Sequence, residues 1–299
     1  MTSQSPKNIP EYLEQLRAAL SGADPALVQD ALYDAEEYLR SELAAQPGVD
    51  EATLIAAVAG SYGAPSEVAE IYRETEATVV HALRAPAPKP RASALGKFVG
   101  VFADPRAYTS LLYMLLAIAT GIFYFTWAVT GLSLSASLAI LIIGIPFVIV
   151  FFASVRGLSL VEGRLIEAML GERMPRRPPY ADRDLPLLSR VKAMFVDPRT
   201  WSTLLYMLLM LPLGIVYFAF AVTALSFSLS IALLPVLQAI NGGGVISFGG
   251  ADYVVSLWAT PVTLLLGFVL IALMLHAARG IGAMHAQLAK HLLVKSGPG

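Results

Sequence analysis

Two long stretches almost free of charged side chains constrain this chain more than any other feature of its sequence. Residues 107–155 contain no Asp, Glu, Lys or Arg, and residues 200–278 contain only Asp252. About 20 apolar residues in a helix cross the ~30 Å hydrocarbon core of a bilayer, and a helix satisfies its own backbone groups there. The sequence therefore predicts four transmembrane helices, over about residues 107–130, 138–155, 201–224 and 257–278.

The remaining charges divide the chain into two unlike parts. Residues 1–84 hold 14 acidic and 5 basic side chains, whereas residues 85–299 hold 8 acidic and 16 basic ones. We interpret residues 1–84 as an acidic helical domain, joined by a Pro/Ala-rich linker at 85–97 to the apolar part. The polar N-terminus has no signal-peptide core, so we expect this domain in the cytosol. The chain has no cysteine, which excludes disulfides, thiolate catalysis and Cys-ligated zinc.

Basic residues predict an orientation. They occur before the first span, between the second and third spans, and after the fourth, whereas the connections at 131–137 and 225–256 have none. Cytoplasmic loops carry the excess of Lys and Arg. We therefore expect the N-terminus, the middle link and the C-terminus on the cytoplasmic side of a bacterial inner membrane.

The apolar part contains an internal repeat. "DPRAYTSLLYMLL" begins at Asp104 and "DPRTWSTLLYMLL" at Asp197, and 21 of 37 aligned positions from these residues are identical. A later "RG" pair also recurs, at Arg156 and Arg279. These matches predict a duplicated domain, with repeat 1 at 98–174 and repeat 2 at 175–299. The predicted orientation makes the repeat parallel, unlike the inverted repeats of many transporters.

Each repeat begins with the same Asp-Pro-Arg junction. Asp104 and Asp197 are predicted to cap the helices that follow, while Arg106 and Arg199 anchor them at the headgroups. Amphipathic segments precede both junctions, "LGKFVGVF" and "LLSRVKAMF", and are typical of interfacial helices. The alternative interpretation makes the Asp and Arg side chains ligand or signal-coupling residues.

The N-terminal part predicts four short helices. Asn8, Asp24 and Asp50 are the expected capping residues, and apolar residues at helical spacing form an inward stripe. The second helix carries an acidic run comprising Asp30, Asp34, Glu36, Glu37 and Glu42. This run is either a solvated face or a surface that docks a basic partner or the protein's own basic middle link.

Two family resemblances rest on these motifs. "EYLEQLRAAL", "DAEEYL" and "GAPSEVAEIY" resemble the HAAS-type helical signalling domain, which implies a PadR-like cytoplasmic regulator as partner. The two "DPR…LLY" units that each end in an "RG" helix resemble the bacterial sensor transmembrane domain found ahead of histidine kinases. This second resemblance implies perception of a signal in or at the membrane. No kinase module follows up to Gly299, so we expect a separate transmitter.

Four further residues are candidates for coupling or ligand binding. His276 ends the fourth span, and Tyr124 and Tyr217 occupy equivalent repeat positions. Asp252 lies in the outer-loop sequence "NGGGVISFGGADY", which predicts a small hairpin that is either a ligand lid or a connector. No Asp, Glu, Lys or Arg falls within the predicted spans, which argues against an ion-coupled transporter or a proton relay.

The predicted fold is therefore all-α, a cytoplasmic bundle plus a four-helix membrane domain with interfacial helices. The favoured function is a non-enzymatic signalling protein that needs no cofactor and binds no nucleic acid directly. Its predicted partners are the lipid bilayer and a cytoplasmic regulator or membrane partner, and self-association into a homo-oligomer is left open. The alternative is an accessory subunit or carrier that binds a lipophilic molecule between the two repeats.

Overall fold

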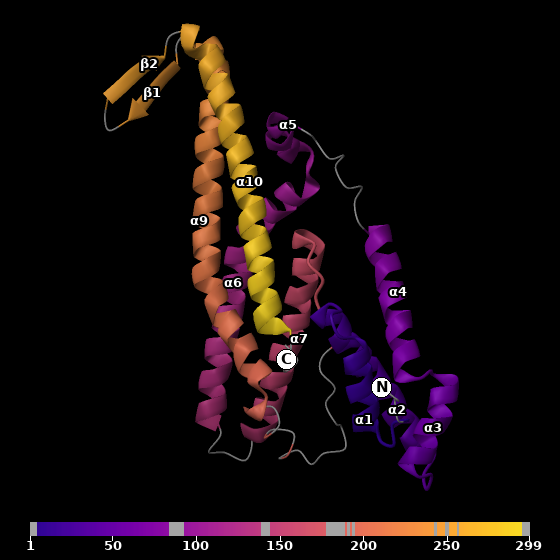
Figure 1. Cartoon of the computed structure of the whole chain (residues 1–299). Helices are drawn as coiled ribbons and strands as arrows, with labels where there is room; N and C mark the ends of the chain where they lie inside the picture. Colours follow the sequence, from indigo (N-terminus) through magenta and orange to yellow (C-terminus); the bar gives the residue numbers. More distant parts are fainter. Residues whose placement is uncertain are drawn as a thin grey trace.

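The computed structural model describes residues 5–83, 93–138, 144–177, 195–241, 244–248, 251–255 and 257–294, together with Ser189 and Lys192. Apart from one two-stranded hairpin, the regular elements of these residues are helical (Figure 1). The prediction of an all-α fold is confirmed. Residues 85–92 of the predicted linker lie outside the described residues. In the segment "LLSRVKAMF", only Ser189, Lys192 and Phe195 are described.

Four short helices form the N-terminal domain: α1 (Ile9–Ala19), α2 (Pro25–Ala45), α3 (Glu51–Ser61) and α4 (Pro65–Leu83). The Asn8 side chain accepts a hydrogen bond from the Glu11 amide, and Asp24 accepts one from the Ala26 amide, so both predicted caps are present. Asp50 holds the capping position of α3 but makes no side-chain cap bond. The core of the domain buries Tyr12, Leu16, Leu39 and Ile55, among others.

The other described elements form the membrane domain, in which a short pre-membrane helix precedes four long ones. These elements are α5 (Ala94–Val99), η1 (Gly100–Ala103), α6 (Pro105–Leu138), α7 (Gly144–Leu170), α9 (Pro198–Asn241), η2 (Leu257–Ala259) and α10 (Thr260–Leu293). The helices α6, α7, α9 and α10 are each long and apolar enough to cross a membrane. Each of the four predicted spans is therefore represented by a helix, and residues 139–143 of the second span lie outside the described residues. The predicted connections were too long, because α6 continues as a helix through residues 131–137 and α9 continues to Asn241 within the connection at 225–256.

The predicted hairpin in the second outer loop is also present. β1 (Gly244–Phe248) pairs antiparallel with β2 (Ala251–Val255), and Gly244 stands opposite Val255. Asp252 lies in β2 opposite Ser247. The hairpin joins the far ends of α9 and α10, away from the N-terminal domain (Figure 1).

The two repeats are packed in opposite directions, so the prediction of a parallel repeat is wrong. Leu111 near the start of α6 and Leu225 from the second half of α9 pack against one cluster, whereas Ala128 further along α6 shares a cluster with Leu204 from the start of α9. The helices α6 and α9 are thus antiparallel, and the two Asp-Pro-Arg junctions lie at opposite ends of their contact (Figure 1). Straight crossings in this arrangement cannot place both junctions on one side of a membrane.

Glycine explains why these two helices pack so closely. A Cβ atom at Gly121 would lie 2.4 Å from the Met210 carbonyl oxygen, and one at Gly214 would lie 2.3 Å from the Ala117 carbonyl oxygen. Small residues allow helix backbones to approach in this way. Gly121 and Gly214 are repeat-equivalent, so the two contacts are related by a pseudo-two-fold axis that runs across the helices.

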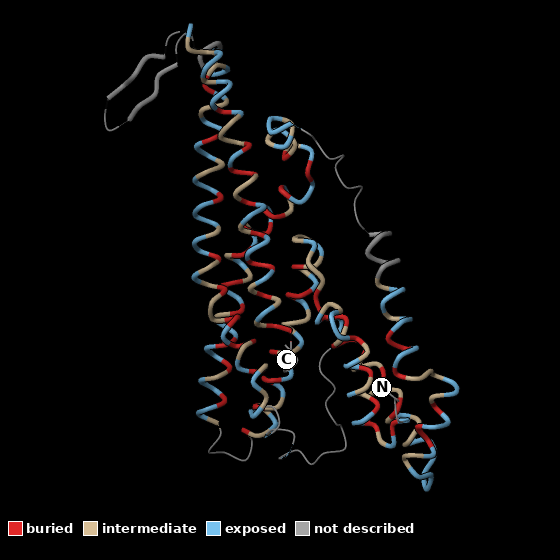
Figure 2. The backbone as a smooth tube through the Cα atoms, viewed as in Figure 1, coloured by how far each residue is buried: buried red, intermediate tan, exposed pale blue. Residues whose placement is uncertain are grey.

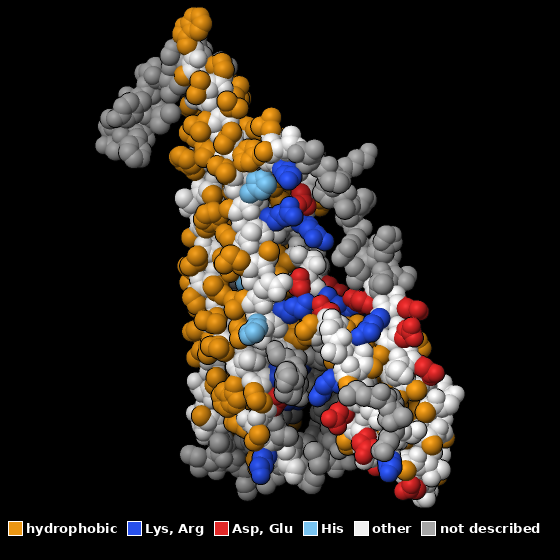
Figure 3. Space-filling view, in the orientation of Figure 1, with side chains coloured by type: hydrophobic (Ala, Val, Ile, Leu, Met, Phe, Trp, Pro, Cys, Tyr) orange, Lys and Arg blue, Asp and Glu red, His pale blue; other side chains and the backbone are white. Residues whose placement is uncertain are grey.

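Burial follows this arrangement. The buried positions of α6, α7, α9 and α10 face one another inside the bundle (Figure 2). Exposed apolar side chains gather over the outer side of α9 and α10, whereas charged side chains gather where the N-terminal domain meets the bundle (Figure 3). The side of the bundle beside that domain is therefore covered by polar protein, and the outer side is suited to lipid.

Candidate functional site

Each Asp-Pro-Arg junction is tied to the opposite repeat. Asp104 Oδ1 accepts a hydrogen bond from the Arg106 amide, and its Oδ2 pairs with Arg279 at 2.8 Å. Asp197 Oδ1 likewise accepts from the Arg199 amide, and its Oδ2 pairs with Arg156 at 3.1 Å. Both aspartates make the capping bonds expected of them. Each "RG" arginine thus holds the junction of the other repeat.

A buried acid and a buried base meet between these two junctions. Glu162 on α7 is 1% exposed, and His285 on α10 is 1% exposed. Tyr113 and Tyr206 donate to Glu162 Oε1 at 2.7 and 2.8 Å, and Tyr124 donates to Oε2 at 3.0 Å. The carboxyl group therefore receives three hydroxyl hydrogen bonds in the interior of the bundle, as a buried polar group requires.

The same hydroxyls reach the imidazole. Tyr113 and Tyr206 lie 2.6 and 3.0 Å from His285 Nε2, and Tyr217 lies 3.3 Å from Nδ1. A hydroxyl has one proton to donate, and two of these donate to Glu162. The pattern therefore assigns the Nε2 proton to neutral His285, which donates to the two hydroxyl oxygens and accepts from Tyr217 at Nδ1.

This centre obeys the pseudo-two-fold symmetry of the repeat. Glu162 lies six residues after Arg156, and His285 lies six residues after Arg279, so the acid and the base hold equivalent positions. The four tyrosines are likewise two equivalent pairs: Tyr113 with Tyr206, and Tyr124 with Tyr217. Duplication thus supplied the scaffold, and divergence at one position supplied an acid–base pair.

The arrangement joins the acid to the base through hydrogen bonds. Tyr113 and Tyr206 each bridge the Glu162 carboxyl group and the His285 imidazole, so an unbroken hydrogen-bond chain connects the two side chains. Ionisable groups inside membrane helices mark functional sites by default. Among the described residues, no three His, Cys, Asp or Glu side chains gather in a way that could hold a metal ion.

Glu162 overturns the expectation that the membrane helices bury no acidic or basic side chain. The second predicted span ends at residue 155, but α7 continues without a break to Leu170 and carries Glu162 into the bundle. The repeat held a usable signal, because Glu162 and His285 are equidistant from the two "RG" pairs. Tyr113 and Tyr206 were likewise visible as repeated residues.

The candidate residues from the sequence fall in three places. Tyr124 and Tyr217 belong to the centre, and the two Asp-Pro-Arg junctions lie at its ends. His276 contacts the pre-membrane helix instead, with Nε2 3.1 Å from the Phe98 carbonyl oxygen and its ring stacked on Phe98. Asp252 is in the distant hairpin, so it does not share a site with the others.

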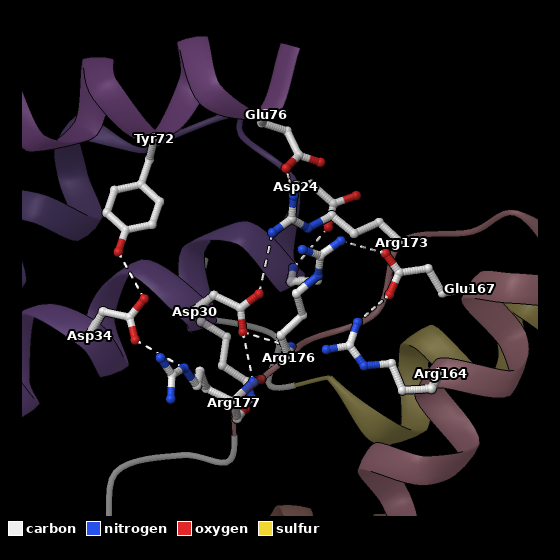
Figure 4. A network of polar contacts seen from close by, with 12 residues as sticks. Asp24, Asp30, Asp34, Tyr72, Glu76, Arg164, Glu167, Arg173, Arg176 and Arg177 are labelled. Atoms are coloured by element: carbon white, nitrogen blue, oxygen red, sulfur yellow. Dashed lines mark hydrogen bonds and ion pairs between the residues drawn. The ribbon is translucent and has the colours of Figure 1, made fainter. Parts of the chain in front are cut away.

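A second polar site joins the N-terminal domain to the membrane domain (Figure 4). We call the extended segment of residues 172–177 after α7 the docking segment. Asp30 Oδ1 accepts from the backbone amides of Arg176 and Arg177 at 2.7 and 2.9 Å, and its Oδ2 accepts from Arg173 at 3.3 Å. Gln29 Nε2 donates to the Arg177 carbonyl oxygen at 2.8 Å. α2 therefore contacts the docking segment through its main chain as well as its charges.

Further ion pairs surround this contact. Arg173 also pairs with Glu76, and Arg177 pairs with Asp34 at 3.1 Å. Lys290 near the end of α10 bridges Asp24 of the N-terminal domain and Glu172 of the docking segment, at 2.6 Å to each. Part of the acidic run on α2 therefore docks on the protein's own basic link, which was one of the two interpretations of that run.

Asp30 is the most buried acid of this contact, at 5% exposed. Burial raises the pKa of its carboxyl above the ordinary value, although the two amides and Arg173 act in the opposite direction. The desolvation of Asp30 therefore offsets part of the attraction.

Comparison with known proteins gives two family matches. Residues 11–71 match the HAAS family, and residues 113–293 match the family described as "Putative sensor". No curated protein and no solved structure matches. The second match covers more than half of the chain, including the acid–base centre and both sides of the repeat. The chain belongs to this sensor family, with a HAAS domain ahead of the sensor domain.

Proposed function

We propose that this membrane protein is a non-enzymatic sensor that passes a membrane or envelope signal to a cytoplasmic partner through its N-terminal domain. One observation carries the proposal. The two helices that supply Glu162 and His285 also supply the groups that hold the N-terminal domain. The docking segment follows α7 directly, and Lys290 lies five residues after His285 on α10.

This connection gives a physical route for a signal. A change in the protonation or hydrogen bonding of Glu162 and His285 alters the contact of α7 and α10 with α6 and α9. Because both helices lead to the docking contact, their shift changes the position of Lys290 relative to Asp24. A signal acts in this way only if it binds the two states differently. The acidic face of α2 is then released or covered.

The partner and the location follow from the same contact. HAAS domains associate with regulators in general, and we propose a PadR-like regulator that binds the N-terminal domain when it is released. Asp24 and Lys290 hold that domain next to the end of α10, which supports a shared cytoplasmic side for the N-terminal domain and the end of α10 in a bacterial inner membrane. The start of α9 is also close, since Ser202 donates to the Leu292 carbonyl oxygen at 2.8 Å.

A distance measurement tests the proposal. The chain has no cysteine, so spin labels at Glu37→Cys and Val161→Cys report only the separation of the N-terminal domain from the bundle. We expect one narrow distance distribution in the parent chain and a broad, longer one in Asp30→Asn. The decisive variant is His285→Gln, which alters the centre and leaves the docking contact itself intact.

The proposal requires His285→Gln to shift the distribution toward that of Asp30→Asn. Met284→Gln is the matched control, because this neighbouring residue of α10 is 74% exposed. A distribution for His285→Gln that coincides with the parent would refute coupling between centre and domain. A carrier of lipophilic molecules receives less support, since tyrosines and the acid–base pair fill the space between the repeats.

A further inference from the structure

The junction of repeat 2 contains two buried donors without a partner. Thr200 is 2% exposed, and its hydroxyl has no hydrogen-bond partner among the described residues. The Nη1 atom of Arg199 is also buried and unpartnered within the described part of the chain. Both residues line one small cavity with Arg156, Ser159 and Thr203. Buried donors left unpaired cost free energy, so their convergence on one space requires an explanation.

The charges around this cavity do not balance. Arg156 and Arg199 bring two positive charges, and Asp197 brings one negative charge. Asp197 is already used, since Oδ1 accepts from the Arg199 amide and Oδ2 pairs with Arg156. Asp30 of α2 also attracts the Arg199 guanidinium, but its two oxygens are bonded to the docking segment. Arg199 Nη1 therefore has no carboxylate of its own among the described residues, and it lies in the first turn of α9, where the helix dipole also favours an anion.

The size of the cavity limits what it can hold. About 10 Å³ is open to the centre of a water-sized group, which is room for about one such group. A halide ion or a single oxygen of a phosphate group fits this space, whereas a whole organic molecule does not. Arg and hydroxyl donors suit both, because each supplies N–H or O–H groups to an anion.

A comparison with repeat 1 shows that an Asp-Pro-Arg junction does not by itself produce this cavity. Arg156 and Arg199 have the equivalents Arg279 and Arg106, so the charged frame is duplicated. Thr200, however, is replaced by Ala107, and Ser159 is replaced by Gly282. In repeat 1 the Ser110 hydroxyl fills the corresponding space, 2.7 Å from where a Cβ of Gly282 would lie. Only repeat 2 combines the arginines with these extra hydroxyls.

We propose that the repeat 2 junction is an anion-binding site, in which Arg199 and Thr200 bind a halide or one oxygen of a phosphate group. Arg156, held by Asp197, adds a second positive charge at the edge of the site. The bound anion completes the charge balance of the junction and fixes the start of α9. This site lies outside the acid–base centre and does not depend on the proposed function.

Ligand-dependent stability tests the site in the full chain. The protein is purified in a nonionic detergent, and its thermal unfolding is followed by the fluorescence of its three tryptophans. Sodium chloride, inorganic phosphate and added phosphatidylglycerol are titrated separately, with sodium gluconate at equal ionic strength as reference. We expect saturable stabilisation, because a ligand that binds only the folded state raises the midpoint. The arm that saturates at the lowest concentration distinguishes a free anion from a lipid phosphate.

Two variants connect that stabilisation to the cavity. Thr200→Ala recreates the sequence of repeat 1 and should raise the half-saturating concentration about tenfold, the loss expected for one hydrogen bond to a charged group. Arg199→Gln should raise it further. Thr120→Ala is the control, since that hydroxyl already donates to the Ala117 carbonyl oxygen of its own helix. The proposal would be overturned if none of the three titrations raised the unfolding midpoint saturably above the gluconate reference. It would also be overturned if Thr200→Ala and the parent chain showed equal shifts of the midpoint.

Discussion

Replacing Glu162 with alanine removes the acceptor that three buried tyrosine hydroxyls share. The lost hydrogen bonds are those of Tyr113, Tyr124 and Tyr206, at 2.7, 3.0 and 2.8 Å. A buried hydroxyl left without a partner costs about 1–3 kcal/mol, whereas hydrogen bonds between membrane helices average only ~0.6 kcal/mol in one well-studied case. We therefore expect the free energy of unfolding to fall by about 2–6 kcal/mol.

The control for this change lies on the same helix. Glu167 pairs with Arg164 and Arg176 at 2.9 and 3.0 Å near the surface, and such pairs contribute about 0–1 kcal/mol. Unfolding in mixed micelles of increasing denaturing detergent, followed by tryptophan fluorescence, compares Glu162→Ala with Glu167→Ala. Equal stability of the two variants would refute the role assigned to the buried carboxylate.

Two further predictions concern the direction in which the repeats pack. Met114 and Ala221 share a cluster, so oxidation should cross-link the pair Met114→Cys and Ala221→Cys. It should not cross-link Met114→Cys to Met207→Cys, where Met207 is the repeat equivalent of Met114. Cross-linking of the second pair and not of the first, seen on a gel, would restore a parallel repeat. Gly121→Ala should lower the unfolding midpoint, since overpacking costs about 1–3 kcal/mol, whereas Gly280→Ala has nothing within 4 Å to meet and should leave the midpoint unchanged or slightly raised. Equal midpoints for the two alanine variants would contradict the close α6–α9 contact.

Local features of the fold could be predicted from the sequence because neighbouring residues determine them. The Asn8 cap and the Asp104 and Asp197 caps depend on residues two or three positions apart, and all three are present. The hairpin follows from β-forming residues between glycines. The presence of four long apolar helices follows from composition alone, but their extent does not, because all four continue well beyond the last residues of their predicted spans.

The relative direction of the repeats could not be predicted in the same way. Sequence identity shows that two units share a fold but does not determine the rotation that relates them. The orientation was predicted by treating basic residues as cytoplasmic anchors. Arg156 and Arg279, however, are paired with Asp197 and Asp104 of the opposite repeats, so their charges are balanced within the protein. A count of basic residues that ignored these ion pairs therefore predicted the wrong symmetry.

The asymmetry between the repeats gives the sharpest test of the centre. Glu162 and His285 both contact the Tyr113 hydroxyl, at 2.7 and 2.6 Å, so their nearest atoms are within about 5 Å. In His285→Glu, two carboxylates would meet there and repel by about 3 kcal/mol at an effective dielectric constant of 20, unless one takes up a proton.

The exchanged pair, Glu162→His with His285→Glu, restores one acid and one base at positions that the pseudo-two-fold axis relates. We therefore expect His285→Glu to lose stability as pH rises from 5 to 8, because a carboxyl group with a raised pKa favours the folded state only while it is protonated. The exchanged variant should recover most of that loss at pH 8 in the same unfolding assay. If it remains as unstable as the single variant, the two positions are not equivalent, and the centre depends on contacts outside the symmetry.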